Sequence, residues 1–341
     1  MGIAPLMEHR LTFSQSSKDS IRHKGGEYDV LGDVVTSWLI LLPPLVGGVP
    51  YNKPMKIAII TGADGDMGME ETRAMAQAGY HTIMACYCPK KAQEKCEKLK
   101  KETGNDNIEV MGIDLANLQT VRNFADTIKE RFGRVDRLMN NAGTLETGQH
   151  FTVDGLERTI SVNYVGPFLL TRLLLPLMPE GARIVNMASC VHPLGRLNFP
   201  HFFEKGCKGC FMRIWPYSNS KLAITLFTFE LAKRIKKLGI TVNAVDPGIV
   251  DTGIIRMQMF FDPITDLIFR PVIRTPLQGA DTAINLLLSE DVEGQTGTFN
   301  RTRRIVSLGK KYTEHPQMLE LWQRTEQIVM PYLTDEAKSL T

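Results

Sequence analysis

Short apolar runs alternate with helical patterns along most of the chain after residue 55. The apolar runs lack a polar–apolar alternation, which is typical of strands that are buried on both faces of a parallel sheet. Strands are expected at Ile57–Ile60, Thr82–Ala85, Ile108–Ile113, Arg137–Asn140, Arg183–Met187 and Thr241–Val245. Helices are expected between them, including Met67–Ala78 and Pro89–Thr103, the second opened by a proline. The predicted fold class is α/β, a Rossmann-type doubly wound parallel sheet with helices on both faces.

The same pattern divides the chain into three parts. Residues 1–54 show no repeating pattern and are expected to form an N-terminal apolar extension, residues 55–310 a single domain, and residues 311–341 a C-terminal helical segment. Residues 34–51 carry no charge, but Pro43-Pro44 interrupts them before the length of about 20 residues that a membrane-spanning helix needs. Two interpretations stay open: an arm packed on its own domain or on a partner subunit, and a peripheral membrane contact.

The composition is that of an ordinary soluble globular protein, with 341 residues, 43% hydrophobic side chains and a net charge of +3. Nucleic-acid binders carry a clear basic excess, so no nucleic-acid partner is expected. Six cysteines are too few for a disulfide scaffold and are expected to be reduced thiols in a cytoplasmic protein. Cys207 and Cys210 form a Cys-x-x-Cys, but no second cysteine pair has metal-like spacing, so no metal site is predicted.

Two residues of a predicted helix have the spacing of an acid/base pair. Tyr217 and Lys221 are four positions apart and share one helix face. A free tyrosine has a pKa of ~10, and an adjacent ammonium lowers this pKa by stabilising the phenolate. Ser189, at a strand end, can hydrogen-bond an oxygen that exchanges a proton with Tyr217. Taken alone, each residue is also compatible with a structural role at a helix edge or in a turn.

Further motifs follow the predicted strands in order. A glycine-rich turn lies at Thr61–Gly68 between the first strand and the first helix, where backbone N–H groups can approach a pyrophosphate. Later come Asn140-Asn141-Ala142-Gly143, Asn163-Tyr164-Val165-Gly166, Ser189, Tyr217-x-x-x-Lys221 and Pro247-Gly248. In this order they resemble the short-chain dehydrogenase/reductase family over about residues 55–300. The long stretch before Tyr217, Gly279–Thr282 and the segment around Leu321-Trp322 resemble its retinol-dehydrogenase-like branch.

The resemblance implies roles for individual residues. It implies a catalytic set of Asn163, Ser189, Tyr217 and Lys221, in which Asn163 supports a water relay to the lysine. It implies cofactor contacts from Gly62, Asp66, Met67, Gly68, Tyr87, Asp114, Leu115, Asn141, Gly143, Tyr217, Lys221, Pro247, Gly248 and Thr252. Asn140 is expected to line the same edge of the cofactor.

Two positions depart from the family pattern. Asp66 stands where the family has glycine and places a negative charge beside the expected pyrophosphate, so weakened binding is expected. Tyr87, after the second strand, is neither the acidic residue that binds the ribose of NAD nor the arginine that accepts the phosphate of NADP. Lys90 and Lys91 are close enough in sequence to substitute for that arginine. Resemblance to the branch favours NADP over NAD.

The resulting hypothesis is an NAD(P)-dependent oxidoreductase that transfers a hydride between nicotinamide and a lipophilic alcohol, aldehyde or ketone, with Tyr217 as general acid/base. The apolar segment Arg256–Arg274 is expected to form a lid over the substrate, with a membrane or subunit contact as the alternative. The alternative is a non-catalytic binding or scaffold protein of the same fold, with cofactor binding weakened at Asp66 and Tyr87. The apolar helix Lys221–Lys237 predicts a homo-oligomer.

Overall fold

Residues 55–146, 148–204, 214–250 and 273–340 are described by a computed structural model. Over these residues the chain forms an eight-stranded sheet with the order β3-β2-β1-β4-β5-β6-β7-β8. The strands are β1 (Ile57–Thr61), β2 (His81–Cys86), β3 (Ile108–Gly112), β4 (Arg137–Asn140), β5 (Arg183–Met187), β6 (Thr241–Val245), β7 (Phe299–Arg301) and β8 (Arg304–Ile305). All neighbouring pairs are parallel except β7 with β8. The strand order reverses between β1 and β4, the place where open α/β sheets bind their ligands.

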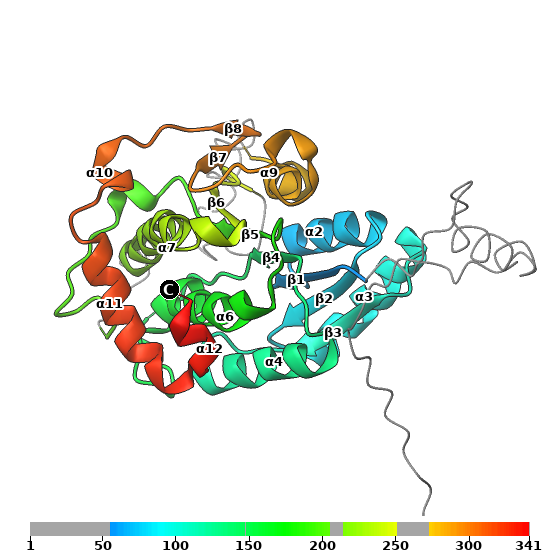
Figure 1. Cartoon of the computed structure of the whole chain (residues 1–341), viewed down its shortest axis with the longest axis horizontal. Helices are drawn as coiled ribbons and strands as arrows, with labels where there is room; N and C mark the ends of the chain where they lie inside the picture. The colour runs from blue at the N-terminus through cyan, green and yellow to red at the C-terminus, as the bar shows by residue number, and fades with distance from the viewer. Residues whose placement is uncertain (1–54, 147, 205–213, 251–272, 341) are drawn as a thin grey trace, which may run out of the picture. The chain divides into compact units, whose positions relative to one another are not determined.

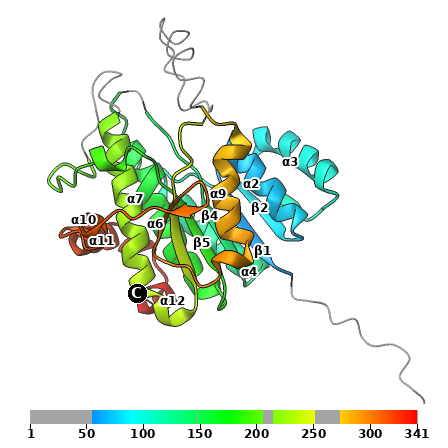
Figure 2. The same ribbon diagram turned by 90° about the horizontal axis from the view of Figure 1, so that it is seen from above.

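Helices cover both faces of the sheet (Figures 1 and 2). One face carries α2 (Asp66–Gln77), α3 (Pro89–Thr103) and α9 (Pro276–Leu288), and the other carries α4 (Leu118–Arg131), α6 (Gly166–Leu174) and α7 (Ile214–Arg234). Shorter helical turns lie between them: α5 (Arg158–Ile160), η1 (Ser161–Val165), η2 (Leu175–Leu177), η3 (His192–Leu194), η4 (Lys236–Leu238) and η5 (Glu290–Val292).

Side chains of each central strand alternate between two hydrophobic cores. In β1, Ile57 and Ile59 join the core under α4, α6 and α7, whereas Ala58 and Ile60 join the core under α2, α3 and α9. Because both faces are covered, the strands read as continuous apolar runs, which is the pattern that predicted them. The predicted doubly wound Rossmann-type sheet is therefore confirmed, and β4, β5, β6 and α3 have the predicted bounds. Strands β7 and β8 were not predicted.

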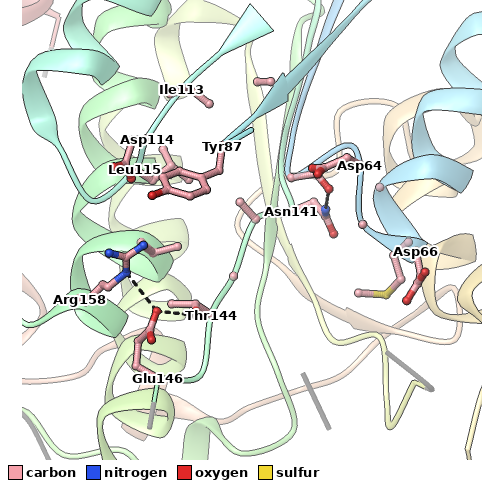
Figure 3. Close-up of a pocket in the computed structure, with 18 residues that line it drawn as sticks. Asp64, Asp66, Tyr87, Ile113, Asp114, Leu115, Asn141, Thr144, Glu146 and Arg158 are labelled. Atoms are coloured by element: carbon pink, nitrogen blue, oxygen red, sulfur yellow. Dashed lines mark hydrogen bonds and ion pairs between the residues drawn. The ribbon is translucent and has the colours of Figure 1, made fainter. Parts of the chain in front are cut away.

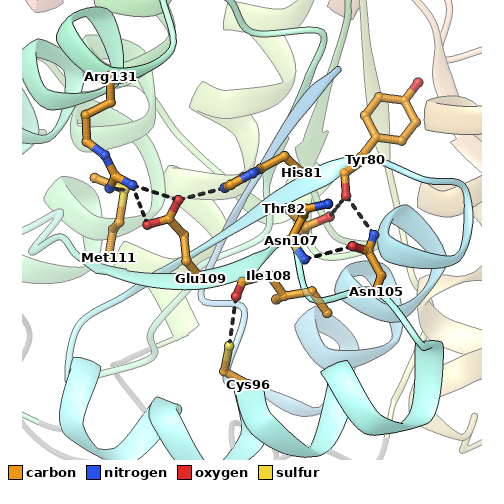
Figure 4. Close-up of polar contacts among 10 residues, drawn as sticks. All are labelled: Tyr80, His81, Thr82, Cys96, Asn105, Asn107, Ile108, Glu109, Met111 and Arg131. Carbon is orange, nitrogen blue, oxygen red and sulfur yellow. Dashed lines mark hydrogen bonds and ion pairs between the residues drawn. The ribbon is translucent and has the colours of Figure 1, made fainter. Parts of the chain in front are cut away.

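Polar contacts fix the outer edge of the sheet, where β2 and β3 pair (Figure 4). Glu109 accepts from His81 Nε2 at 2.6 Å and from Arg131 Nη2 at 2.9 Å, which ties both strands to α4. Asn105 Nδ2 donates to the main-chain oxygen of Tyr80 at 3.1 Å, just before β2 begins. These contacts hold β2 in place, and with it the residues that follow its carboxyl end.

The C-terminal segment packs into the core on the α6 and α7 side. It consists of α10 (Lys310–Thr313), α11 (Met318–Val329), η6 (Met330–Tyr332) and α12 (Asp335–Ser339). Trp322 of α11 is buried, with its ring centre 5.0 Å from that of Phe168 and 5.9 Å from that of Phe227. Arg172 is fully buried on α6, and its Nη1 lies 2.8 Å from Glu326 Oε1. The segment therefore completes this core.

The apolar face of α7 corrects one argument about assembly. Its large side chains, which motivated the predicted homo-oligomer, are buried within the chain itself. They are Leu222, Leu226, Phe227, Phe229 and Leu231. Since they pack in the chain's own core, they supply no surface for a partner subunit, and the homo-oligomer stays a prediction.

Among the described residues, one helical stretch, Arg158–Leu177, is long and apolar enough to cross a membrane. Its apolar window is 83% buried inside the domain, which identifies it as a core helix. Several predictions lie outside the described residues: those for residues 1–54, for Cys207 and Cys210, for Thr252, and for nearly all of the expected lid at 256–274.

Candidate active site

A cavity of about 420 Å³ opens at the carboxyl ends of the strands around the β1–β4 switch point (Figure 3). It collects predicted cofactor residues from four separate segments of the chain. These are Gly62, Asp66, Met67, Gly68, Tyr87, Asp114, Leu115, Asn141 and Gly143. The cavity lining also includes Glu146 and Arg158, which the sequence analysis did not select.

The loop between β1 and α2 leaves room only for glycine at two places. Gly62 has a φ of +63°, and a Cβ added to it would lie 2.9 Å from Ala142 Cα. A Cβ on Gly68 would collide with the carbonyl oxygen of Gly62. The side chain of Asn141 holds the loop from the other side, with Nδ2 donating to the oxygens of Thr61 (3.0 Å) and Gly62 (3.2 Å). The result is a bare backbone cradle at a helix N-terminus, which fits the pyrophosphate of a dinucleotide.

Asp66 is the first residue of α2, and its side chain is exposed. A carboxylate in the first helical turn interacts favourably with the helix dipole, so it stabilises the free protein. The same position places it at the rim of the cavity, at the opposite end from Arg158 (Figure 3). Lys95 of α3 donates a hydrogen bond to the main-chain oxygen of Asp64, which ties this loop to the neighbouring helix.

The far end of the cavity is built around Tyr87, which follows β2 and is 67% exposed. The guanidinium carbon of Arg158 lies 5.8 Å from the centre of the Tyr87 ring. Arg158 Nε lies 3.1 Å from Glu146 Oε1, which also accepts from Thr144 Oγ1 at 3.0 Å. Asp114 completes this end, with its Oδ1 accepting from a main-chain N–H at 2.9 Å.

Lys90, Lys91 and Asn140 were expected near the cofactor, but they do not line the cavity. Lys90 and Lys91 lie in the first turn of α3 and are not among the described residues that line the cavity, whereas Arg158 is. Asn140 is buried and does not line it either. Its Nδ2 donates to Thr171 Oγ1 at 3.0 Å and to Asn186 Oδ1 at 2.8 Å. The expectation that Asn140 lines the cofactor edge is therefore wrong, because its side chain joins β4 to β5 and α6.

Tyr217 and Lys221 lie on successive turns of α7. Lys221 Nζ is 5.5 Å from the centre of the Tyr217 ring and donates to Met187 O at 2.8 Å. Burial raises the pKa of Tyr217 to about 12, although a hydrogen bond with the Ser189 side chain acts to lower it. Burial also lowers the pKa of Lys221 to about 8, opposed by the nearby carboxylate of Asp246. The tyrosine, the serine and the lysine are thus one cluster.

Asn163 lies in η1, a π-helical turn between α5 and α6, and such turns are frequent at functional sites. Its Oδ1 accepts from Thr144 N at 2.7 Å, and its Nδ2 donates to Thr144 O at 2.9 Å and to Ser220 Oγ at 3.0 Å. A Cβ placed on Gly143 would lie 3.6 Å from Asn163 Oδ1 and 3.7 Å from Lys221 Nζ. Gly143 therefore joins the cavity to the Tyr217 cluster.

The loop after β6 carries Pro247 and Gly248, which are not part of the cavity lining. Gly248 has a φ of +78°, and its N–H donates to Asp246 Oδ1 at 2.9 Å. Asp246 is fully buried and is paired with Arg301, whose Nε lies 2.7 Å from Oδ2. Asp246 was not predicted as a site residue, although its place directly after a strand end could have indicated it.

The comparisons with known proteins agree with this geometry. The family model described as short chain dehydrogenase matches residues 56–202 and 205–259. The chain belongs to the short-chain dehydrogenase family. Retinol dehydrogenase 14 of Mus musculus is 34% identical over 298 residues, 83% of this chain and 88% of the relative. Retinol dehydrogenase 11 of the same species is 36% identical over 252 residues, 72% and 77% of the two chains.

Among solved structures, a blue fluorescent protein from a metagenomic library in complex with NADPH superposes with a TM-score of 0.58 and 26% identity, covering 72% of this chain and 95% of the other. The resemblance to the retinol-dehydrogenase-like branch is thereby confirmed. This short-chain dehydrogenase is an oxidoreductase that acts on the CH–OH group of donors with NAD or NADP as acceptor.

Proposed function

We propose that this short-chain dehydrogenase interconverts a lipophilic alcohol with its aldehyde or ketone, using NADP(H) in preference to NAD(H), with Tyr217 as general acid/base. One observation carries the proposal: Tyr217, Lys221, Ser189 and Asn163 form one cluster. None of the four lines the cavity with the glycine cradle, but Gly143, which does line it, lies beside Asn163 and Lys221. The similarity to retinol dehydrogenases 14 and 11 supports a retinoid-like or other long apolar alcohol as the substrate class.

When bound, the nicotinamide cofactor supplies or accepts the hydride. Tyr217 gives its phenolic proton to the carbonyl oxygen in the reductive direction and removes it from the alcohol in the oxidative direction. The Ser189 hydroxyl, a hydrogen-bond partner of Tyr217, donates to the same oxygen as negative charge develops on it. The Lys221 ammonium stabilises the phenolate, and its N–H groups beyond the bond to Met187 O can hold ribose hydroxyls.

Asn163 has a positioning role in this proposal. Its side-chain amide makes three hydrogen bonds that fix the main chain of Thr144 and the hydroxyl of Ser220. Thr144 follows Gly143, which lines the cavity beside Lys221, so Asn163 fixes the main chain between the cavity and the acid/base cluster. The water relay through Asn163 stays a prediction of the family resemblance.

The experiment uses the purified full chain with NADPH and retinal, and in the reverse direction with NADP and retinol. Loss of the phenol in Tyr217→Phe should lower kcat by about 10²- to 10⁴-fold, the usual contribution of a general acid/base. Tyr332→Phe removes a phenol that donates to Asp154 at 2.8 Å and does not line the cavity, and it should leave turnover unchanged. Equal turnover in Tyr217→Phe and wild type would reject the proposal.

A non-catalytic binding or scaffold role is the alternative, and the carboxylates of the cavity favour it. Asp64, Asp66, Asp114 and Glu146 all line the space that a dinucleotide with a negative pyrophosphate would fill. A ligand at 100 times its Kd adds about 2.7 kcal/mol to the free energy of unfolding. A thermal unfolding series with NADPH, NADH, NADP and NAD therefore separates the two roles. The scaffold is supported when none of the four shifts the transition at millimolar concentration.

Peripheral membrane contact through residues 34–51, cytoplasmic location and homo-oligomer formation stay separate predictions. Flotation of the full chain with lipid vesicles, compared with a chain that begins at residue 55, tests the first. Sedimentation of the full chain over a range of concentrations tests the last.

A further inference from the structure

Arg158 gives the cavity its positive charge. Among the cavity-lining residues that the structure describes, it is the only lysine or arginine, and it faces four carboxylates. It stands in α5, which follows β4 along the chain, and not at the end of β2, where the sequence was searched for a cation. Folding brings it beside Tyr87, 71 positions earlier in the chain.

The side chain of Arg158 is held by Glu146 and by a hydrogen bond with the side chain of Tyr87. Its Nε lies 3.1 Å from Glu146 Oε1, and Glu146 is itself fixed by the hydroxyl of Thr144. The two terminal nitrogens lie on the side of the guanidinium that faces Tyr87 (Figure 3). A guanidinium presents its donors in a planar fork that matches the oxygens of a phosphate.

The position of Tyr87 identifies the ligand group that meets this fork. In dinucleotide-binding sheets, the residue after the second strand lies beside the adenosine ribose, and its chemistry separates NAD from NADP. A carboxylate there would bind the ribose hydroxyls, but this chain has Tyr87 followed by Cys88. Tyr87 instead has an exposed aromatic ring on which an adenine can stack, and the guanidinium of Arg158 lies 5.8 Å from the centre of this ring.

We propose that Arg158, oriented by Glu146 and Tyr87, binds the 2′-phosphate of NADP(H) and determines the preference of this chain for NADP(H) over NAD(H). This inference rests on the proposed function, because it assumes that a nicotinamide dinucleotide occupies the cavity. It assigns the cofactor selectivity to a residue of α5 and not to a residue at the end of β2. Lys90 and Lys91 are the competing cations, and both are exposed on α3.

The test measures the Kd of NADPH, NADH, 2′,5′-ADP and 5′-AMP by titration calorimetry. Arg158→Gln should weaken NADPH and 2′,5′-ADP by about tenfold or more, the value of one charge-assisted phosphate contact, and leave NADH and 5′-AMP within about threefold. Arg158→Lys, which keeps the charge but loses the fork, should fall between wild type and Arg158→Gln.

Two control variants complete the test. Arg131→Gln removes an arginine that pairs with Glu109 outside the cavity, and it should change no Kd. Lys90→Gln/Lys91→Gln should leave the ratio of the NADPH and NADH constants unchanged. Added salt should reduce the preference for NADPH over NADH in wild type and in Arg131→Gln, but much less in Arg158→Gln.

The outcomes separate this inference from the proposed function. If Arg158→Gln weakens NADPH and NADH equally, or if only the double lysine variant loses selectivity, the assignment to Arg158 is wrong while the enzyme remains. If wild type binds neither dinucleotide in a folded sample, both the inference and the proposed function fail. If Arg158→Gln does not fold, Arg158→Lys still decides the question. A preference for NADPH over NADH in Arg158→Lys that equals the wild-type preference contradicts the need for a guanidinium.

Discussion

The ammonium of Lys221 lies 5.5 Å from the centre of the Tyr217 ring, one turn along the same helix. Burial raises the pKa of the phenol to about 12 and lowers that of the ammonium to about 8. The lysine is thus the first of the two groups to lose its proton, near pH 8. Under the proposed mechanism, the pair takes up the proton of an alcohol once it has lost one proton of its own.

The pH profile of alcohol oxidation tests this pairing. In wild type, kcat/KM should rise with pH through an apparent pKa near 8, because the reaction needs the pair to have lost one proton. Lys221→Met removes the ammonium but not the burial, so the rise should move upward by at least about one pH unit. Lys237→Met removes an exposed ammonium that lies shortly after the end of α7, and it should keep the wild-type profile. An unchanged profile in Lys221→Met contradicts the pairing.

Asp66 should stabilise the protein at the expense of cofactor affinity. Asp66→Asn keeps the size of the side chain and removes its charge from the first turn of α2. We expect the Kd of NADPH to fall about fivefold, since removing a like charge at this range is worth on the order of 1 kcal/mol. Urea unfolding should show a loss of about 0.3–1 kcal/mol from the helix-dipole interaction. Asp106→Asn, an exposed aspartate after α3, serves as the control and should change neither quantity.

Asn163 should affect turnover through the main chain that its side chain positions. Asn163→Ala removes three hydrogen bonds, each worth about 1 kcal/mol net, and releases the main chain of Thr144. We expect a loss of about 2–3 kcal/mol in the free energy of unfolding, together with a lower kcat and a weaker affinity for NADPH. Ser220→Ala removes the hydroxyl partner and leaves both Thr144 contacts, so its effect on NADPH affinity should be small. Equal effects of the two variants would speak against the positioning role.

Glu71 should make the stability of the domain depend on pH. Its carboxyl is completely buried in α2, neither oxygen has a hydrogen-bond partner, and burial raises its pKa well above the usual value. The folded state then binds a proton that the unfolded state releases near pH ~4.3, so the free energy of unfolding falls as the pH rises above that value.

Glu71→Met should remove this dependence. Urea unfolding at pH 5 and pH 8 should show a larger loss of stability in wild type than in Glu71→Met, and the variant should be the more stable protein at pH 8. Glu94→Met, at an exposed position of α3, should retain the wild-type dependence. A wild-type stability that stays constant or increases from pH 5 to pH 8, with no difference from Glu71→Met, would rule out this account.

The strands were predictable because each is buried on both faces, which leaves long apolar runs such as Ile57–Ile60. Strands β7 and β8 were missed because they lie at the sheet edge and contain polar residues, Asn300 and Arg301 among them. The residues after β1, β2, β3 and β4 were selected correctly as neighbours, because parallel strands bring their carboxyl ends to one edge.

The rest depended on where helices pack. Arg158 looks in sequence like a surface charge at a helix start, and only the placement of α5 brings it to Tyr87. From the sequence, Glu71 looks like an exposed charge beside Glu70, and only the packing of α2 shows that it is buried. The π-helical turn at Asn163 has no local signal in a stretch that otherwise reads as continuous helix. Side-chain environments of this kind follow from tertiary packing and not from local pattern.

The burial of Trp322 against Phe168 and Phe227 has a consequence for how the protein is made. Trp322 follows Phe168 of α6 and Phe227 of α7 along the chain, so one of the two cores stays open until α11 has been synthesised. During synthesis the nascent chain therefore exposes the apolar faces of α6 and α7 until α11 emerges. The protein should depend on chaperones at that stage, and premature termination before Trp322 should give an aggregating fragment in place of a shorter enzyme.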